Sequence, residues 1–403
     1  MNQDARRRLE AVFREEHGRI VGGLVRRYGD VELAQDATSE AIETALVRWP
    51  VDGVPPNPGG WLATTANRKA LDRLRRESGR EVKESAATAM LNTDALPLGV
   101  IDDDRLRLLF LCTHPAIAFE ARVALTLRLV SGLGTAEIAR AFLVPDRTVA
   151  QRITRARRKI ADARIAFRIP EREDLPQRVA GVLAVLYLVF NEGYLATFDP
   201  AGTRDDLAVE AIRLTRMLVD LLPAEPEPQG LLALLLITQS RRDARVVGGR
   251  LVPLDEQDRN RWDAALLAEG VRRVRALRDI GRPGPYQVQA AIAAAHSTAH
   301  PQDVPWSEVV DLYDLLLKLA PSDVVRLNRA LALAHVEGPA AGLALVDALH
   351  LPNYAAWHAA RGHLLEQLGR AEASAAAFER ATAETENPLE REHLRRRATR
   401  ARS

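Results

Sequence analysis

Apolar residues recur at spacings of three and four along most of this chain, which is the periodicity of an amphipathic α-helix. The first such run covers residues 9–25 and ends at Gly29, and Asp30 is placed to cap a second helix. Aromatic residues make up only 5% of the 403 residues, while Ala, Leu and Arg abound, so helices are favoured over sheet. We therefore expect an all-α protein.

The length, the single cysteine and the lack of long apolar runs narrow the class of protein. A chain of 403 residues fits two or three domains, and one cysteine, Cys112, excludes a disulfide framework within the chain. The first residues are polar and charged, unlike a signal peptide. The apolar run "GLLALLLI" at residues 230–237 is far too short to span a bilayer. We expect a cytoplasmic protein with no membrane segment.

Charge is distributed unevenly along the chain. Residues 1–168 hold 28 Lys and Arg against 22 Asp and Glu, whereas residues 169–403 hold 28 against 32. A basic first part favours a nucleic-acid partner, and a mildly acidic second part favours contacts with a protein or a small molecule.

The first hundred residues are expected to contain three helices and a linker. The second helix is followed by the segment "PVDGVPPNPGG" at residues 50–60, which is so rich in Pro and Gly that we expect a loop. A third helix over residues 61–78 has a strongly basic end, and the periodicity is lost over residues 79–101, which we expect to be a linker.

Residues 135–160 have the pattern of a helix-turn-helix. Ile138 and Phe142 belong to one apolar face, and Val149 and Ile153 belong to the next, with a short turn at residues 143–145 between them. Pro145 and Asp146 suit the start of the second helix through a preset φ and a favourable dipole interaction. A basic helix in a bundle would show the same charge run, but the buried pattern and the turn favour a helix that reads DNA.

The first turns of that second helix carry side chains that can reach base edges, since Arg pairs with guanine, Gln with adenine, and Thr contacts the thymine methyl. These side chains are Arg147, Thr148, Gln151, Arg152 and Arg155. A further set is better placed for phosphates, which supply affinity without sequence information. That set is Arg157, Arg158, Lys159 and Arg164.

Three features of the first part stand in a fixed order before this motif: an acidic second helix, the Pro/Gly segment and a basic third helix. Each alone has a plain explanation, because acidic faces are usually just solvated and basic helix ends complement the macrodipole. In this order, an acidic surface for a basic protein partner precedes a loop that could hold an extruded base beside a basic helix.

With these motifs the sequence resembles the extracytoplasmic-function sigma factors of bacteria. "DATSEAIETALVRWP" looks like their polymerase-binding helix, "PGGWLATTANRKALDRLRRE" like the helix that melts the −10 promoter element, and "GTAEIARAFLVPDRTVAQRITRARRKI" like the domain that binds the −35 element. Four segments of the second half, "YLVFNEGY", "QDRNRWD", "GPYQVQAAIAAAH" and "LNRALALA", resemble the subgroup with a long tetratricopeptide-like C-terminal extension.

The resemblance implies two small helical sigma domains, the second with the helix-turn-helix, followed by a helical extension. The implied ranges are 1–78 for region 2, 79–101 for the linker, 102–168 for region 4 and 169–403 for the extension. It further implies an alternative sigma factor that directs core RNA polymerase to promoter DNA. The extension would regulate it, through a regulatory protein or peptide as partner.

The resemblance also assigns residues to each contact. For core polymerase it implies Asp36, Ser39, Glu40 and Glu43. For the −10 element, with a flipped base held at residues 54–60, it implies Asn57, Trp61, Asn67, Arg68, Lys69, Arg73 and Arg76. For the −35 element it implies Arg147, Thr148, Gln151, Arg152, Arg155 and Arg158. Two positions depart from the family pattern: Ser39 stands where Gln is common, and Asn67-Arg68 stands where Arg-Asn is usual.

The second half is helical almost throughout and repetitive near its end. Gly338 and Gly369 lie 31 residues apart, close to the period of a tetratricopeptide repeat, and the pattern is clearest over residues 320–390. In the second copy, the small Gly362 and the bulky Phe378 match the repeat.

The segment "YLVFNEGY" places polar residues inside an apolar run, where burial without partners is costly. A helix end whose polar side chains satisfy nearby backbone groups explains it most simply. A regulatory contact through Asn191, Glu192 and Tyr194 is the alternative. His296 and His300 have the i, i+4 spacing of zinc ligands, but no third ligand accompanies them, so we expect no metal site.

Two other classes of function compete with a sigma factor. A helix-turn-helix regulator with a tetratricopeptide-like sensor domain would bind DNA without replacing sigma and would not need the acidic helix. An enzyme is disfavoured because the sequence contains no phosphate-binding glycine-lysine loop, nucleophile elbow or metal cluster. We expect no catalytic residue and no cofactor.

Overall fold

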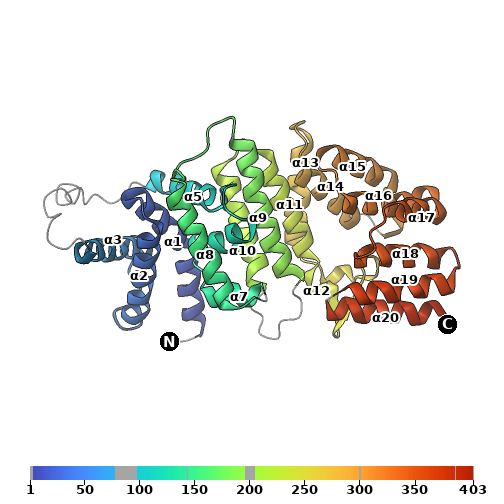
Figure 1. The fold of residues 1–403 in the computed structure, drawn as a ribbon, viewed down its shortest axis with the longest axis horizontal. Coiled ribbons are helices and arrows are strands. Elements are labelled where there is room, and N and C mark those ends of the chain that lie inside the picture. Colours follow the sequence, from blue (N-terminus) through green and yellow to red (C-terminus); the bar gives the residue numbers. More distant parts are fainter. Residues whose placement is uncertain are drawn as a thin grey trace. The chain divides into compact units, whose positions relative to one another are not determined.

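A computed structural model describes residues 3–77, 98–142, 144–195, 205–298, 301–385 and 387–402, and its elements are almost all helices (Figure 1). The only strands within these ranges are β1 (Val246–Val247) and β2 (Arg250–Leu251), two residues each, which pair antiparallel with Val246 opposite Leu251. The expected all-α class is confirmed.

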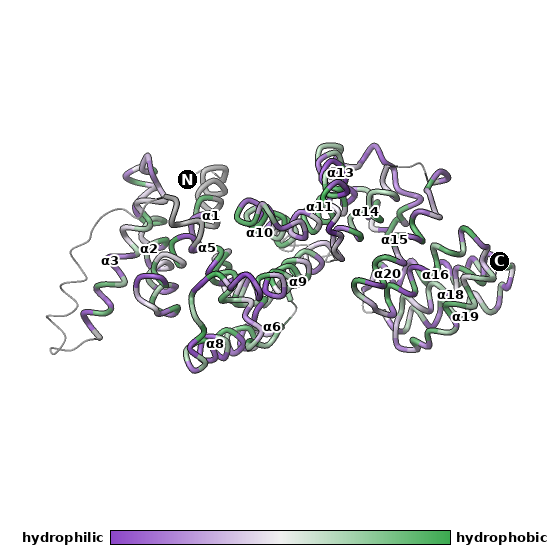
Figure 2. Tube along the Cα trace, turned by 90° about the horizontal axis from the view of Figure 1, so that it is seen from above, coloured by the Kyte–Doolittle hydropathy of each residue, from purple (hydrophilic) through white to green (hydrophobic). Residues whose placement is uncertain are grey.

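The chain divides into two compact units, residues 1–221 and 222–403. The helices of the first unit are α1 (Gln3–Tyr28), α2 (Val31–Asp52), α3 (Pro58–Glu77), α5 (Leu98–Cys112), α6 (Phe119–Leu129), α7 (Thr135–Ala141), α8 (Asp146–Asp162), α9 (Leu175–Leu195) and α10 (Asp205–Leu221). In both units, hydrophobic and hydrophilic residues alternate around most helices, as an amphipathic pattern requires (Figure 2).

The predicted boundary between the first two helices is confirmed. Gly29 follows α1 with a φ of 70°, a conformation that glycine adopts without strain. The Asp30 carboxylate then caps α2, accepting hydrogen bonds from the Glu32 and Leu33 amides at 2.8 and 3.0 Å.

The expected loop at residues 50–60 is shorter than the sequence indicated. Helix α2 continues through Pro50 to Asp52, and α3 already begins at Pro58, so only residues 53–57 are non-helical. Both prolines lie near a helix end: a proline at the first helical position loses no hydrogen bond that would otherwise form, and Pro50 interrupts only the last turn of α2. The prediction that all eleven residues form a loop was therefore wrong.

One core of the first unit forms around α5, α6 and α8. Leu109, Phe110 and Leu125 are fully buried there. Helix α9 packs on the same core, since the Arg178 guanidinium donates to the Phe110 carbonyl at 2.6 Å. Residues 78–97, which contain most of the expected linker, lie outside the described residues; its last residues, from Leu98, begin α5.

The second unit begins with a helix most of whose residues are buried. Its elements are α11 (Pro226–Ser240), α12 (Arg242–Arg245), β1, β2, η1 (Leu254–Glu256), η2 (Arg259–Arg261), α13 (Ala264–Arg278), α14 (Pro285–Thr298), η3 (Pro301–Asp303), α15 (Trp306–Leu319), α16 (Asp323–Glu337), α17 (Pro339–Ala348), α18 (Ala355–Gln367), α19 (Ala371–Glu384) and α20 (Pro388–Arg402). Leu231, Leu232 and Leu235 of α11 are fully buried. Within the described residues, no helix combines the length and the apolar character needed to cross a bilayer.

Two of the motifs that support the resemblance have structural roles in this unit. In "GPYQVQ", the Tyr286 and Gln287 amides at the start of α14 donate to the Glu227 carboxylate of α11, both at 3.2 Å. In "QDRNRWD", Asp263 caps α13, and the Arg259 guanidinium lies over the Trp262 ring, 4.9 Å from its centroid. The first motif therefore joins α14 to α11, and the second fixes the start of α13.

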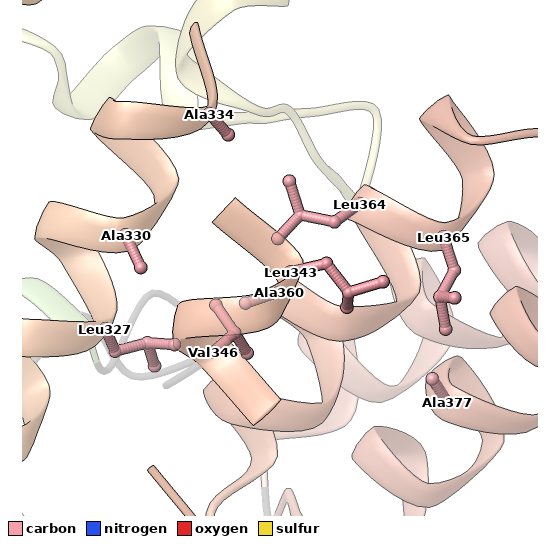
Figure 3. Close-up of a cluster of buried hydrophobic side chains, with 9 residues drawn as sticks. All are labelled: Leu327, Ala330, Ala334, Leu343, Val346, Ala360, Leu364, Leu365 and Ala377. Carbon is pink, nitrogen blue, oxygen red and sulfur yellow. The ribbon is translucent and has the colours of Figure 1, made fainter. Parts of the chain in front are cut away.

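The repetitive segment forms two helix pairs, α16 with α17 and α18 with α19. Gly338 and Gly369 lie between the helices of each pair with φ values of 94° and 68°. Gly362 packs so close to Phe378 that a Cβ atom would come within 2.8 Å of its ring. Figure 3 shows the cluster of buried Leu, Val and Ala side chains between these helices. The expected helix, glycine turn, helix arrangement is present, while its assignment as a tetratricopeptide repeat remains a prediction.

Candidate nucleic-acid interface

Helices α7 and α8 form the predicted helix-turn-helix. Ile138 of α7 and Val149 of α8 are each 1% exposed and belong to the shared core. The turn between the helices is fixed by two backbone hydrogen bonds, from Val144 to the Ala139 carbonyl at 3.1 Å and from Thr148 to the Pro145 carbonyl at 2.8 Å. Leu143, within this turn, lies outside the described residues.

The predicted reading side chains of α8 face away from this core. Arg147, Gln151, Arg155 and Arg158 are exposed, while Thr148 and Arg152 are half-buried. Within the described residues, none of these four arginines forms an ion pair. Their guanidinium groups are therefore available to an external acceptor such as a phosphate or a base edge.

Arg152 has a different environment from the other arginines of α8. It lines a groove of about 310 Å³ between α8 and the residues before α6, together with Ile117, Glu120 and Arg155. It also borders a smaller cavity that reaches Leu188 of α9. The side chain that we expect to read a base is thus half-buried beside a groove, unlike the exposed Arg147, Arg155 and Arg158.

The acidic face of α2 lies directly against the basic face of α3. Arg73 Nη1 is 2.5 Å from Asp36 Oδ2, and Lys69 Nζ is 3.6 Å from Glu40 Oε2. The structure thus joins residues predicted to bind polymerase to residues predicted to bind DNA. Sequence reasoning missed this pairing, although both helices place the two charges four residues apart, on one face each.

The other predicted residues of α2 and α3 divide between solvent and local contacts. Glu43 is exposed and Ser39 is half-buried. Arg68 and Arg76 of α3 are exposed, and Arg76 donates to the Asp72 carbonyl at 3.2 Å. The Asn67 side chain accepts a hydrogen bond from the Tyr28 hydroxyl at 2.7 Å, so this amide serves packing between α1 and α3.

The segment between α2 and α3 combines a helix cap with exposed apolar side chains. Asn57 Oδ1 accepts from the Gly60 amide at 2.9 Å and so caps α3. Trp61 packs edge-on against the buried Trp49, with ring centroids 5.4 Å apart. Val51 and Val54 are 84% and 53% exposed, which sequence reasoning did not foresee. Apolar side chains left in water beside a short loop suit contact with a base or another apolar group.

A buried polar junction joins α1 to α5 and α6. Asp104 of α5 is fully buried and accepts from Arg26 Nε of α1 at 2.8 Å and from Arg107 Nη1 at 2.7 Å. The His17 imidazole of α1 lies 3.1 Å, through Nδ1, from the Leu129 carbonyl at the end of α6. Burial, partly offset by this hydrogen bond, lowers the pKa of His17 to about 4, so the ring is neutral at physiological pH.

Glycines allow the close approach at this junction. A Cβ atom on Gly18 would lie 2.6 Å from the Val130 carbonyl oxygen, and one on Gly22 would lie 2.8 Å from that of Asp104. The spacing of four in "HGRIVGG" puts both glycines on one face of α1 and was the available sequence signal for this contact. Nothing in the sequence pattern showed which segment would meet that face.

Helix α2 also reaches α8. Arg157 Nη1 lies 4.0 Å from Glu32 Oε1, one helical turn before Asp36. The two basic helices α3 and α8 therefore contact neighbouring positions of a single acidic helix.

The remaining candidate residues lie elsewhere. Asn191, Glu192 and Tyr194 fall in the last turns of α9, where the Tyr194 ring stacks on Phe190 with centroids 5.5 Å apart. Their regulatory role stays a prediction. Among the described residues no group of His, Cys, Asp and Glu could hold a metal ion; His300 is outside them.

Comparison with known proteins assigns both halves of the first unit. Residues 12–80 match Sigma-70 region 2, and residues 109–160 match Sigma-70, region 4. Residues 178–278 match a family of unknown function, DUF6596. No solved structure matches the chain significantly.

Two relatives extend the comparison. An uncharacterized protein of Rhizobium meliloti, R00370, is 43% identical over 387 residues, covering 93% of this chain and 91% of that protein. A probable ECF RNA polymerase sigma factor of Mycobacterium tuberculosis, SigI, is 30% identical over 164 residues, covering 39% of this chain and 56% of that protein. The chain belongs to the extracytoplasmic-function sigma factors of the sigma-70 family, in the subgroup that carries a long C-terminal extension.

Proposed function

We propose that this protein binds core RNA polymerase and directs it to a specific set of promoters, and that its C-terminal extension regulates this activity. The observation that carries the proposal is the combination of an acidic α2, a basic α3 and the exposed arginines of α8 within one compact unit. Such a protein catalyses no reaction itself and acts in the cytosol, where polymerase and the chromosome lie.

In this proposal the acidic face of α2 docks on a basic surface of the polymerase. The Asp36 and Glu40 side chains are 35% and 40% exposed and are already paired with Arg73 and Lys69. Exposed ion pairs contribute only about 0–1 kcal/mol each, so a polymerase surface with several cations would displace them at little cost. Displacement frees Arg73 and Lys69 for DNA phosphates, which links polymerase binding to promoter binding.

Promoter opening would follow at the segment between α2 and α3. A base extruded from the non-template strand loses stacking worth a few kcal/mol, which contacts with a pocket and with the backbone must offset. The exposed Val51 and Val54, the Trp61 ring and the exposed Arg68 supply apolar contact and positive charge at that place.

Binding both promoter elements requires region 2 and region 4 to separate. The −35 and −10 elements are about 25 base pairs apart, or about 85 Å at 3.4 Å per base pair. In the first unit, α3 and α8 contact positions only one turn apart on α2. The junction of α1 with α5 and α6 must therefore open when the protein engages a promoter.

Transcription from purified components tests the proposal. Adding the protein to core polymerase should give promoter-specific transcripts that disappear with the double variant Asp36→Ala/Glu40→Ala. Tight, sequence-specific DNA binding without polymerase, together with no stimulation of core polymerase, would instead support the helix-turn-helix regulator.

The role of the extension is tested by two truncations, because α9 and α10 belong to the first unit. A chain ending at Ile169 removes helices that pack on α5 and α6, whereas a chain ending at Leu221 removes only the second unit. If the second unit inhibits, the chain ending at Leu221 should be more active than the full chain. If it is required, that chain should be inactive although it still binds polymerase.

A further inference from the structure

The second unit contains a cavity of about 260 Å³ that none of the proposed contacts with polymerase or DNA uses. Its walls come from α14, α15, α16 and α18, and apolar residues such as Ala334 and Leu364, both visible in Figure 3, form part of its surface. Ligand pockets usually measure roughly 300–1,000 Å³, so this one would hold a molecule of about one ring with a substituent.

Aromatic rings dominate one wall of the cavity. The Trp306 indole and the His335 imidazole stack in parallel, with centroids 3.7 Å apart and an angle of 1° between the planes. The His296 ring contacts the Trp306 ring edge-on, with the two centroids 5.2 Å apart. A flat, preorganised surface of this kind binds a planar ring by stacking at little entropic cost.

Several polar groups at the cavity have no partner. Within the described residues, no hydrogen bond is made by the Tyr313 hydroxyl, the Asn328 carboxamide or the imidazoles of His296 and His335. Asn328 and His335 are exposed, whereas Tyr313 and His296 are half-buried. Polar groups in partly buried positions are usually paired, so these two half-buried groups on one cavity point to an external partner. All four can both donate and accept, except that the neutral imidazoles divide these roles between their two nitrogens.

No Asp, Glu, Lys or Arg is among the described residues that line the cavity, and burial favours the neutral forms of its His and Tyr side chains. Burial lowers the pKa of His296 to about 4, with Arg241 and His335 acting in the same direction. Burial also lowers the pKa of His335 and His363, against smaller opposing effects of Asp255 on both and of Glu366 on His363. Burial raises the pKa of Tyr313 to about 12. A charged ligand would find no counter-charge in this lining and would lose its hydration.

We propose that this cavity binds a small, uncharged, planar aromatic molecule bearing a carboxamide-like group, which packs on the Trp306–His335 pair and exchanges hydrogen bonds with Asn328 and Tyr313. Such binding would place a small-molecule sensor within the extension. The inference is independent of promoter recognition.

Matched probes that differ only in charge test the proposal on the full chain. Nicotinamide and benzamide are neutral ring amides, and nicotinate and benzoate are their anionic counterparts at pH 7.5. By calorimetry or ligand-observed NMR we expect the amides to bind with a Kd of about 1–10 mM, the range for fragments of nine atoms. The acids should bind at least tenfold more weakly.

Variants assign the binding to the cavity. Asn328→Ala and His335→Ala change exposed side chains without hydrogen-bond partners, so the fold should persist, as checked by thermal unfolding. Each should weaken amide binding at least fivefold, while Asn353→Ala, an exposed asparagine before α18, should leave it unchanged.

The proposal is overturned if neither amide shows saturable binding, if the acids bind as well as the amides, or if binding is insensitive to both variants. Binding of N-acetyl-tryptophan amide with no binding of the free ring amides would likewise overturn it and assign the cavity to a peptide.

Discussion

Arg73 of α3 and Asp36 of α2 form an ion pair at 2.5 Å, and each belongs to a different predicted interface. Charge complementarity between the two helices thus satisfies, within the free protein, the same groups that polymerase and DNA would use. An exposed ion pair of this kind contributes only about 0–1 kcal/mol, so an external partner can replace it, yet it orients α3 on α2 in the free protein.

Removing the Asp36 side chain and removing the Arg73 side chain should affect different binding steps. Asp36→Ala should weaken binding to core polymerase about tenfold, equivalent to 1.4 kcal/mol. Arg73→Ala breaks the same pair and should leave polymerase binding unchanged while weakening promoter binding. Affinities from fluorescence titration with core polymerase decide the matter: equal losses from both variants would mean that Asp36 acts only by holding α3.

Arg152 and Arg158 of α8 should differ in the kind of affinity they supply. Arg152 is half-buried against α6, so Arg152→Ala should cost about 1–3 kcal/mol at one base-pair position of the −35 element. Arg158 is exposed, so Arg158→Ala should weaken all promoters alike and reduce the slope of log K against log salt by about 0.9. Transcription from promoters with single −35 substitutions, at several salt concentrations, separates the two; uniform losses from both variants would contradict this division.

Gly18 should tolerate no larger residue, because of the close approach of α1 to α6. A glycine-to-alanine change inside a helix stabilises by about 1 kcal/mol through propensity alone. In Gly18→Ala the new Cβ would meet the Val130 oxygen at 2.6 Å, and overpacking of this kind costs about 1–3 kcal/mol. Gly181→Ala in α9 is the matched control, since its nearest neighbour is at 3.7 Å, and it should stabilise. Denaturant unfolding measures both; stabilisation by Gly18→Ala would show that the junction is looser than described.

Lowering the pH should reduce the stability of the contact between α1 and α6, because His17 becomes protonated. Its pKa is about 4 in the folded state and 6.5 in a free side chain, so the unfolded chain binds more protons between these values. The contribution to stability is complete above pH 6.5 and is lost as the pH falls towards 4, amounting to about 2 kcal/mol between pH 7.5 and pH 5. His17→Asn keeps a donor for the Leu129 carbonyl but does not titrate. The difference in free energy of unfolding between the two proteins should therefore change by that amount, and a pH-independent difference would refute the assignment.

Glu227 should stabilise the second unit by accepting hydrogen bonds from the start of α14. It accepts from two backbone amides and from the Gln287 side chain at 3.1 Å. Glu227→Ala leaves these donors unpaired and should cost about 1–3 kcal/mol in thermal unfolding. Glu372→Ala changes an exposed carboxylate on α19 and should cost less than 0.5 kcal/mol. Equal effects would show that the contact between α11 and α14 is not fixed by Glu227.

Local features were predictable from the sequence, and contacts between distant segments were not. The cap at Asp30, the start of α8 at Asp146 and the glycine turn at Gly369 follow from residues within one or two turns. The contact of His17 with Leu129 joins residues 112 positions apart, and no local pattern specifies such a pair. The early start of α3 was missed because proline reads as a helix breaker, although at the first position of a helix it is favoured.

The candidate site shows the same division. The residue types of α2, α3 and α8 were predictable because charge and helical period show which side chains are polar and on which face. Their mutual neutralisation was not, because it depends on how α2 packs between the other two. The cavity of the second unit was invisible for the same reason: Trp306 and His335 are unremarkable residues until two helices bring their rings together.

The position of α9 and α10 has a consequence for building chimeras of such proteins. These helices follow region 4 in the sequence and match the start of the DUF6596 family, yet they pack with the first unit. A chimera joined where the sigma regions end would lack α9 and so expose Phe110 and its neighbours. To keep the chimera soluble, the extensions should be exchanged after Leu221. Genes that exchange their 3′ ends at that point would keep both sigma regions with an intact core and acquire a different extension.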